Sequence, residues 1–213
     1  MSLLVVTSVA AEREAVVAGL PPDAPVDVAV VGVGPAAAAA ATSRLLALAE
    51  AGGTPYPRMV CVGIGGGFGD RVGLGGVVLG TRSVAADLGA ASPAGFLSLD
   101  ELGFGPTSTL PDPELFAALH AALPYAVPGA VLTVSTVTGT TDRAVELRKR
   151  YPDAAAEGME GYGIACAASL AGVGYAELRA ISNAVGPRDR GAWKVGEALA
   201  GLTALAEPLA ALG

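Results

Sequence analysis

The sequence predicts an α/β fold: a single-domain, three-layer α/β/α arrangement with a mixed central sheet. Short apolar runs alternate with helical patterns at both ends of the chain, and the middle is richer in strand-like runs. Of the 213 residues, 52% are hydrophobic and 15% are charged, as expected for a sheet that is buried on both faces. The sequence has no linker or repeat, so we expect one domain over residues 1–213.

The first part of the chain alternates strands and helices. In order, we expect a strand at 2–8, a helix at 10–20, a strand at 26–33, a helix at 36–51, and strands at 59–64 and 76–84. Apolar runs mark the strands. Glu12 and Glu14 lie in the first turn of the first helix, where the helix dipole favours anions. The turn at 32–35 starts the alanine-rich second helix, and Gly52-Gly53 ends it.

The second part of the chain begins with a long segment, 87–111, that is rich in Gly and Pro. It has no clean period, so we expect a loop with one short strand or turn, and its length indicates a function beyond connection. After it we expect a helix at 112–123, a strand at 130–137, a helix at 142–151, a short strand-like piece at 154–160, a helix at 161–172, a strand at 176–182 and a helical region at 193–212.

Charge and apolar content limit the possible partners. The net charge of −7 argues against nucleic acid, whose phosphates need a basic face, and against an anionic membrane surface. The longest apolar region, 26–49, is interrupted by Gly32, Gly34 and Pro35, so we expect no transmembrane helix. The N-terminus lacks the basic region of a signal peptide. The surplus of apolar residues favours a homo-oligomer, at least a dimer.

Cysteine and histidine usage predicts a cytoplasmic protein without a metal site. Cys61 and Cys166 each lie in an apolar run, and we expect both to be reduced core residues. The single histidine, His120, lies in a helical pattern and is expected to face solvent. One histidine is too few for a zinc-protease site, and the chain has no G-x-S-x-G elbow for a Ser-His-Asp triad.

Two glycine-rich stretches differ in what they indicate. The pattern Gly32-x-Gly34-x-x-Ala37 matches a loose dinucleotide fingerprint, but it follows the second strand, and the acid that would hold the ribose, Glu50, ends a helix. We therefore expect no nicotinamide cofactor, and no P-loop motif occurs. The run 63–67 ends a strand in glycines. It either lets a ligand approach bare backbone N–H groups or forms a plain tight turn.

The stretch 176–195 predicts one wall of a pocket. Its strand ends in Ser182-Asn183, and a charged loop with Arg188 and Arg190 then leads to the single tryptophan, Trp193. Ligands of open α/β proteins bind just beyond the carboxyl ends of strands. A polar strand-to-helix turn is the alternative interpretation.

Two carboxylates are expected at the same edge of the sheet as Asn183. Glu12 follows the first strand, and Glu160 follows the short strand before the helix at 161–172. Either one alone suits the start of a helix. All three polar side chains at one edge favour a binding site.

These residues resemble the nucleoside phosphorylase and nucleosidase superfamily over nearly the whole chain. The resemblance is carried by Glu12, Gly65-Gly66-Gly67, Gly158-Met159-Glu160-Gly161 and Arg179-Ala180-Ile181-Ser182-Asn183. Within the superfamily the chain is most similar to methylthioadenosine/S-adenosylhomocysteine nucleosidases and to futalosine hydrolases, and the tail up to Trp193 is typical of the latter. The resemblance implies a nucleoside phosphorylase-like fold. It also implies hydrolysis of futalosine to hypoxanthine and dehypoxanthine futalosine in menaquinone biosynthesis, without a cofactor.

The resemblance also implies a role for each residue. Glu12 would be the base that deprotonates water, and Arg179 would hold the water and Glu12 in place. Glu160 would accept hydrogen bonds from the ribose hydroxyls and stabilise the positive charge of the transition state. Further contacts to the ribose and the purine would come from Met159, Gly65, Gly66, Val137 and Thr138.

Three departures from the family pattern bear on the reaction. Asn183 replaces the Asp of adenine-specific nucleosidases, and its NH₂ group can donate to the O6 or N7 atom of hypoxanthine. Ile64 replaces a Ser near the water. The turn at 32–39 has no arginine for phosphate, which leaves Arg71 and Arg82 as weaker candidates and favours water as the nucleophile.

Other functions remain open at this point. They are a methylthioadenosine/S-adenosylhomocysteine-type nucleosidase, an inosine-type purine nucleoside phosphorylase, and a non-catalytic purine-nucleoside binding protein. Arg188 and Arg190 are candidates for holding the carboxyphenyl end of futalosine, and an outward-facing or intramolecular pair is equally consistent with the sequence.

Overall fold

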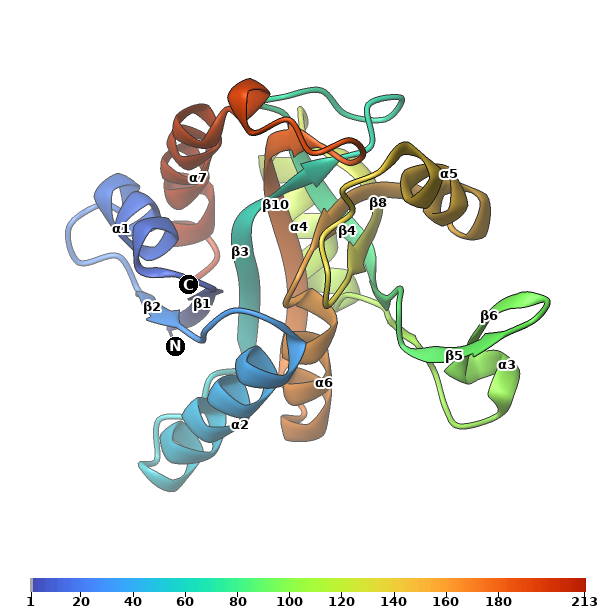
Figure 1. Ribbon diagram of the computed structural model, residues 1–213. Helices are drawn as coiled ribbons and strands as arrows, with labels where there is room; N and C mark the ends of the chain where they lie inside the picture. The colour runs from blue at the N-terminus through green and yellow to red at the C-terminus, as the bar shows by residue number, and fades with distance from the viewer. Residues whose placement is uncertain (1) are drawn as a thin grey trace.

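The computed structural model describes residues 2–213 and consists of one large sheet with helices on two sides (Figure 1). The strands of the large sheet are β1 (Leu3–Thr7), β2 (Val26–Val30), β3 (Arg58–Gly67), β4 (Val77–Ala85), β7 (Ser108–Thr109), β8 (Val127–Thr133), β9 (Ala154–Gly158) and β10 (Gly174–Ala184). The helices are α1 (Ala10–Gly19), α2 (Pro35–Ala51), α3 (Leu99–Leu102), α4 (Pro113–Ala122), α5 (Thr141–Arg150), α6 (Gly161–Ala171) and α7 (Val195–Ala210).

The large sheet is mixed, as predicted, and part of it closes on itself. β3 pairs in parallel with β1 and β10, and β8 pairs in parallel with β4 and β9. β10 runs antiparallel to β4, and β9 runs antiparallel to the end of β3. β3, β10, β4, β8 and β9 therefore form a closed ring of paired strands, and β1 and β2 extend it on one side.

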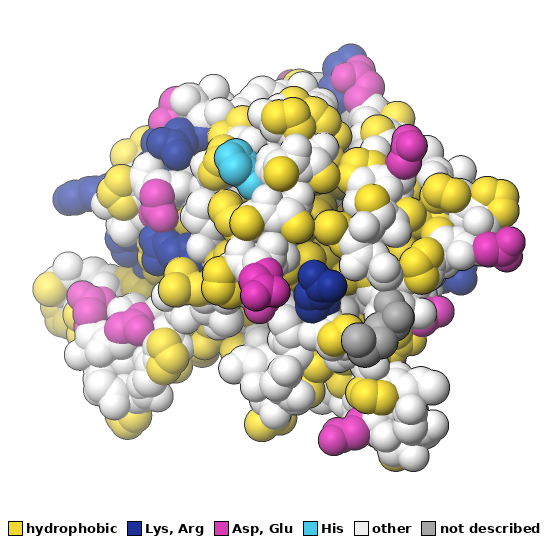
Figure 2. Space-filling model, turned by 180° about the vertical axis from the view of Figure 1, so that it is seen from behind, with side chains coloured by type: hydrophobic (Ala, Val, Ile, Leu, Met, Phe, Trp, Pro, Cys, Tyr) yellow, Lys and Arg dark blue, Asp and Glu magenta, His cyan; other side chains and the backbone are white. Residues whose placement is uncertain are grey.

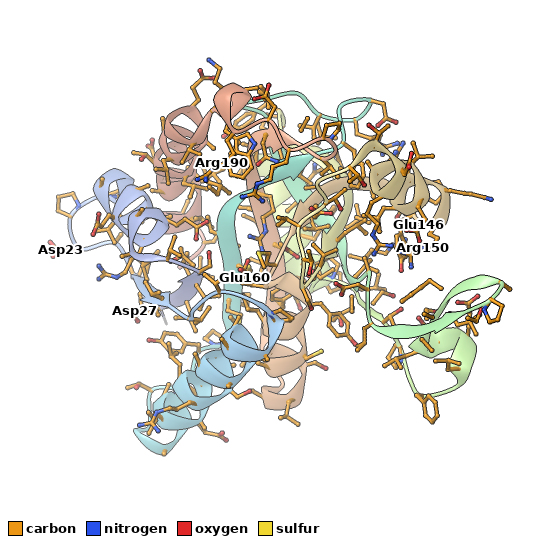
Figure 3. The ribbon with its side chains drawn as sticks, viewed as in Figure 1. Asp23, Asp27, Glu146, Arg150, Glu160 and Arg190 are labelled. Carbon is orange, nitrogen blue, oxygen red and sulfur yellow. The ribbon has the colours of Figure 1, made fainter. Side chains whose placement is uncertain are left out.

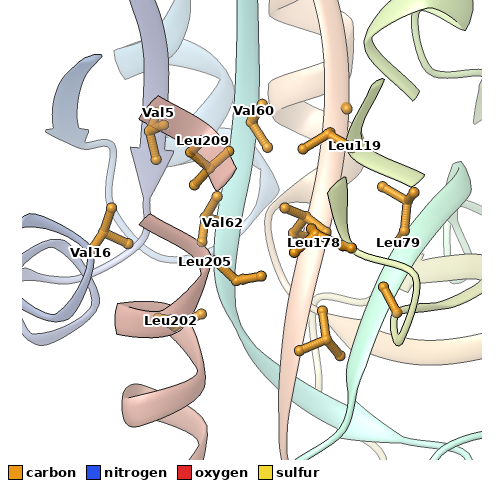
Figure 4. Packing of buried hydrophobic residues seen from close by; sticks show 14 of the residues in the cluster. Val5, Val16, Val60, Val62, Leu79, Leu119, Leu178, Leu202, Leu205 and Leu209 are labelled. Atoms are coloured by element: carbon orange, nitrogen blue, oxygen red, sulfur yellow. The ribbon is translucent and has the colours of Figure 1, made fainter. Parts of the chain in front are cut away.

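Helices cover the sheet in two layers, which confirms the three-layer prediction. α1, α4 and α7 pack on one face through a cluster that includes Val16, Leu119 and Leu205 (Figure 4). α2 and α6 cover the other face, where Leu46 and Ile164 contact the strands β1 and β3. All five residues of β1 are buried, as expected for a strand covered on both faces. Many of the apolar residues of the chain are thus buried between the sheet and the two layers of helices.

The ends of β2, β3, β8 and β10 differ from the prediction, and β2 stops at Val30 rather than at residue 33. β10 continues through Ser182 and Asn183, and β3 continues through Gly65 to Gly67, although both segments carry turn residues. The reason is pairing: Asn183 aligns with Gly66, and Gly67 aligns with Ala156 of β9. Ladder hydrogen bonds to distant strands therefore override the local turn signal. β8 begins and ends earlier than predicted.

The segment 87–111 holds more structure than the loop that we predicted. It contains the hairpin of β5 (Gly89–Ser92) and β6 (Gly95–Ser98), followed by α3 and β7. The hairpin and α3 project from the body of the molecule (Figure 1). The Ser98 hydroxyl caps α3 by accepting a hydrogen bond from the backbone of Glu101.

The two cysteines differ in burial. Cys61 lies in the core, as predicted, but Cys166 is exposed on α6, so the prediction was wrong for Cys166. An apolar run on a helix cannot tell which of its members faces outward when small residues surround it.

His120 is exposed on α4, as predicted (Figure 2). None of the helices between residues 2 and 213 combines the length and the apolar character needed to cross a bilayer.

Candidate active site

A cavity of about 360 Å³ opens at the carboxyl ends of β1, β3 and β10. Its volume lies in the range of small-molecule sites. Eight of the nine residues that we predicted for the site line this cavity: Glu12, Gly65, Gly66, Val137, Thr138, Met159, Glu160 and Asn183. The ninth, Arg179, lies in the wall behind them, where its guanidinium contacts Glu160. Strands from both ends of the chain thus bring these residues to one place.

Glu12 is fixed by backbone and side-chain donors at the start of α1. Its Oε2 atom accepts hydrogen bonds from the N–H of Ser8 (2.9 Å), the hydroxyl of Ser8 (2.6 Å) and the N–H of Val9 (3.3 Å). Its Oε1 atom accepts one bond, from the N–H of Ile64 at 2.9 Å. Only 2% of Glu12 is exposed. The Ile64 side chain replaces a Ser of the family pattern, yet its backbone still orients the carboxylate.

Glu160 lies where the starts of α2 and α6 meet (Figure 3). Its Oε1 atom accepts a hydrogen bond from the N–H of Gly34 at 3.2 Å. Gly34 has a φ of 87°, a left-handed conformation that glycine adopts without strain, so the turn presents this N–H to the carboxylate. The glycine pattern that resembled a dinucleotide fingerprint therefore binds a protein carboxylate.

Arg179 connects Glu160 to a second buried carboxylate. Its Nε atom donates to Glu177 at 2.9 Å, and its Nη1 atom lies 3.4 Å from Glu160. Burial opposes a charged guanidinium, yet the acidic groups around Arg179 raise its pKa well above the usual value. A Cβ atom on Gly63 would lie 2.8 Å from Nη1 of Arg179 and 3.0 Å from Oε1 of Glu12. Glycine at this position therefore leaves room for the ends of the two side chains to converge.

Glu157 is a further carboxylate in the cavity wall, and it holds the loop after β8. The N–H of Thr138 donates to Glu157 at 2.8 Å, and the Thr138 hydroxyl donates to the other carboxylate oxygen. Burial raises the pKa of the Glu157 carboxyl, and the bonds from Thr138 offset part of this effect. Glu157 thus fixes Thr138, which we predicted to border the ligand.

Glu157→Gln is expected to change how stability depends on pH. A carboxyl whose pKa is higher in the folded chain than in the unfolded chain reduces stability as the pH rises between the two values. The amide cannot ionise, and it retains an acceptor for the Thr138 N–H. The variant should therefore gain stability relative to the wild type as the pH rises from the ordinary range of Glu. Urea unfolding at a series of pH values measures this, and a difference that stays flat or falls with pH would contradict it.

Asn183 presents its amide to the cavity in a defined orientation. Its Nδ2 atom donates to the carbonyl oxygen of Ala184 at 3.0 Å, and its Oδ1 atom accepts from the Ser182 hydroxyl at 2.9 Å. A carbonyl can only accept, so the first bond fixes the NH₂ end of the amide. One N–H of Asn183 remains to donate to a ligand.

The mouth of the cavity carries the opposite charge from its interior. Arg188 and Trp193 line it, and the Arg188 guanidinium lies 5.4 Å from the centre of the Trp193 ring. Arg190 lies 5.8 Å from the same ring, in the segment before α7 (Figure 3). Arg188 is the one cationic side chain among the described residues that line the cavity.

Sequence reasoning missed Glu157, Glu177 and Ser8. Glu177 was detectable in principle, because a charged residue inside the apolar run of β10 needs a partner, and Arg179 on the same face supplies it. The Ser83 hydroxyl, on β4, and the Tyr175 hydroxyl, on β10 itself, also donate to Glu177, and the first of these bonds joins β10 to β4. Glu157 and Ser8 had no local signal, since their roles depend on residues brought close by folding.

The sequence is similar to those of known proteins along most of its length. A family model described as the Phosphorylase superfamily matches residues 6–212. The chain belongs to this superfamily. A futalosine hydrolase from Streptomyces coelicolor is 48% identical over 218 residues, which cover 95% of this chain and 92% of that relative.

Solved structures of the superfamily share the fold at low identity. A methylthioadenosine/S-adenosylhomocysteine nucleosidase from Neisseria meningitidis superposes with a TM-score of 0.83 at 19% identity, covering 99% of both chains. A futalosine hydrolase from Helicobacter pylori gives 0.82 at 13% identity, covering 100% of this chain and 98% of that one. Because the two scores are nearly equal, likeness of fold does not separate these two activities.

Proposed function

We propose that the protein hydrolyses the N-glycosidic bond of futalosine with water, releasing hypoxanthine and leaving dehypoxanthine futalosine, in menaquinone biosynthesis. The observation that carries this proposal is the 48% identity to a futalosine hydrolase over 95% of the chain. The cavity supports it, because its interior gathers buried carboxylates next to a purine-compatible amide.

Cleavage of a nucleoside places positive charge on the ribose in the transition state. Glu12 and Glu160 line the cavity and are 2% and 4% exposed, respectively. Fixed carboxylates in a water-poor site stabilise a developing cation without reorganising. Glu160 retains acceptor capacity for the ribose hydroxyls beyond its bonds to the protein, and Met159, which lines the cavity, would pack beside the sugar. Glu160 and Met159 therefore hold the ribose, and the carboxylates of Glu12 and Glu160 favour its cationic form.

Glu12 is placed to act as the general base. Its Oε2 atom is saturated by three donors from Ser8 and Val9, whereas Oε1 accepts a single bond from Ile64. Oε1 therefore keeps a lone pair that can accept the proton of a water molecule. Arg179 binds Glu160 and Glu177, and so it acts on the water through this carboxylate cluster.

Hypoxanthine fits the polar groups on the other side of the cavity. The free N–H of Asn183 can donate to O6 or N7 of the purine, and the backbone of Gly65, Gly66, Val137 and Thr138 borders the base. An oxygen at position 6 accepts hydrogen bonds, whereas the amino group of adenine donates them. The amide of Asn183 therefore favours a 6-oxopurine.

Asn183→Asp should shift the preference from hypoxanthine toward adenine. The change removes the N–H that donates to O6 and introduces a group that can accept from a 6-amino group or protonate N7. We expect kcat/KM for futalosine to fall about ten- to a hundredfold, because a neutral hydrogen bond is lost and a carboxylate then faces the O6 lone pairs, at a cost of about 1–3 kcal/mol. Kinetics with futalosine and methylthioadenosine measure the ratio. An unchanged ratio of kcat/KM values would show that Asn183 does not read the purine.

The proposed function is tested by product identification. The purified protein is incubated with futalosine, aminofutalosine, methylthioadenosine and inosine, and the purine released is identified by chromatography and mass. Hypoxanthine release from futalosine, with little adenine from methylthioadenosine, supports the proposal. Adenine release from methylthioadenosine as the dominant activity would assign a general nucleosidase, and tight binding without turnover would assign a binding protein.

Water is favoured over phosphate by the distribution of cations. Arg82, a weak candidate for phosphate, pairs with Asp153 at 2.8 Å. Arg71, the other candidate, is exposed and outside the set of residues that line the cavity. Among the described residues that line the interior beside Glu12 and Glu160, none carries a positive charge that could bind phosphate.

We further propose that the protein acts in the cytoplasm as at least a homodimer. Several large apolar side chains are mostly exposed, among them Phe104 (78%), Leu110 (73%) and Leu170 (85%). Together with the 52% hydrophobic composition of the chain, these exposed apolar side chains support association with a second copy. The acidic net charge of −7 supports small-molecule substrates rather than nucleic acid.

A further inference from the structure

The cavity has two ends of opposite character. Its interior holds the carboxylates of Glu12, Glu157 and Glu160, and its mouth holds Arg188 beside Trp193. A ligand that fills it from end to end must therefore place a group that becomes cationic inside and an anionic group at the mouth. We propose that Arg188 and Trp193 form a subsite for an aromatic carboxylate at the end of the substrate remote from the purine.

Neither arginine of the mouth is neutralised within the protein. Among residues 2–213, the ion pairs involve neither Arg188 nor Arg190. The acid between them, Asp189, instead accepts a hydrogen bond from the N–H of Gly191 at 3.0 Å, which stabilises the short turn η1 (Arg190–Ala192). This excludes the intramolecular pair that the sequence left open and leaves the Arg188 guanidinium available to a ligand.

The backbone holds Arg188 and Trp193 against the rest of the site. The N–H of Arg188 donates to the carbonyl of Gly139 at 3.2 Å, in the loop that carries Thr138. The N–H of Lys194, next to Trp193, donates to the carbonyl of Ser182 at 2.7 Å. The mouth is thus attached both to the end of β10 and to the loop that borders the purine.

The two side chains suit an aryl carboxylate. A guanidinium binds a carboxylate through two parallel hydrogen bonds, and an indole ring stacks on another aromatic ring. The contact between the guanidinium and the Trp193 ring fixes the geometry of both. This inference rests on the proposed function, because futalosine carries a carboxyphenyl ketone on the side of its ribose away from hypoxanthine.

Fluorescence tests the subsite without turnover. Trp193 is the single tryptophan of the chain, so its emission reports on the mouth alone. Titration with 3-acetylbenzoate should change the emission in a saturable way in the wild type and in Arg44→Gln, which alters an exposed arginine of α2 outside the cavity, and the affinity should fall at least about tenfold in Arg188→Gln. Neutral 3-acetylbenzamide should bind the wild type about as weakly as the acid binds Arg188→Gln. Equal binding of acid and amide would overturn the proposal.

Kinetics then separate this inference from the proposed function. Arg188→Gln should raise KM for futalosine about tenfold or more. The same variant should raise KM for the methyl ester of futalosine far less, because the ester has no carboxylate for Arg188 to bind. Arg44→Gln, the matched control at an exposed arginine of α2 outside the cavity, should leave KM unchanged for both substrates. Equal losses for acid and ester in Arg188→Gln would overturn the subsite and leave the proposed function intact. Absence of hypoxanthine release from futalosine by the wild type would refute the function, and the fluorescence titration would still decide the subsite.

Discussion

Glu12→Gln should lower kcat for hypoxanthine release by about 10²- to 10⁴-fold, the usual contribution of a positioned general base. Ser8 and Val9 direct three donors at one carboxylate oxygen, so they will take the single oxygen of the amide. The NH₂ group then replaces Oε1, the atom that we assign to the water. The base is removed with little change in volume, and KM should change little.

The measurement is steady-state hydrolysis of futalosine together with a binding titration. Glu14→Gln is the matched control, because Glu14 is exposed on the same turn of α1. In Glu12→Gln the NH₂ group of the new amide will face the N–H of Ile64, so a loss of about 1–3 kcal/mol in stability is expected and should be measured alongside. Turnover close to that of the control would refute the role of Glu12.

Arg179→Met should destabilise the protein by about 3–5 kcal/mol, because it leaves two buried carboxylates without their cation. Glu160 and Glu177 both depend on this guanidinium and are 4% and 1% exposed, respectively. The loss should exceed that of any surface ion pair. Activity should fall as well, since Glu160 would lose a contact that orients it.

Urea unfolding of the variant measures this cost. Arg82→Met is the control, because the pair of Arg82 with Asp153 is partly exposed and should contribute about 0–1 kcal/mol. Arg179→Lys retains the charge but not the fork of donors, and it should fall between the wild type and Arg179→Met. If Arg179→Met lowers the free energy of unfolding by no more than Arg82→Met does, the Arg179 guanidinium does not stabilise Glu160 and Glu177 as we expect.

The sequence was sufficient to predict the layers and the edge of the sheet that holds the site. Apolar runs and helical periods depend on local burial, so they identified most elements. Glu12, Glu160 and Asn183 could be placed together because each follows a strand, and parallel strands end at one edge. The structure puts all three around one cavity.

Features that depend on distant pairing could not be predicted. β10 runs past Ser182 because Asn183 pairs with Gly66, which lies far away in the chain. Glu177 is satisfied by Ser83 and Tyr175, and the first of these belongs to another strand. Arg179 was expected to hold Glu12, yet its guanidinium pairs with Glu160 and Glu177. The spacing of Glu177 and Arg179 in β10 could have indicated that pair, whereas no local pattern identifies Ser83 or Glu160 as partners.

The most direct test of the account is the rate of hypoxanthine release from futalosine in buffer without phosphate, compared with the rate after phosphate is added. We expect the same rate in both, with free dehypoxanthine futalosine as the sugar product, because Glu12 activates water and the described residues that line the cavity interior include no cation for phosphate. Release that requires phosphate and yields a sugar 1-phosphate would contradict this account and assign a phosphorylase.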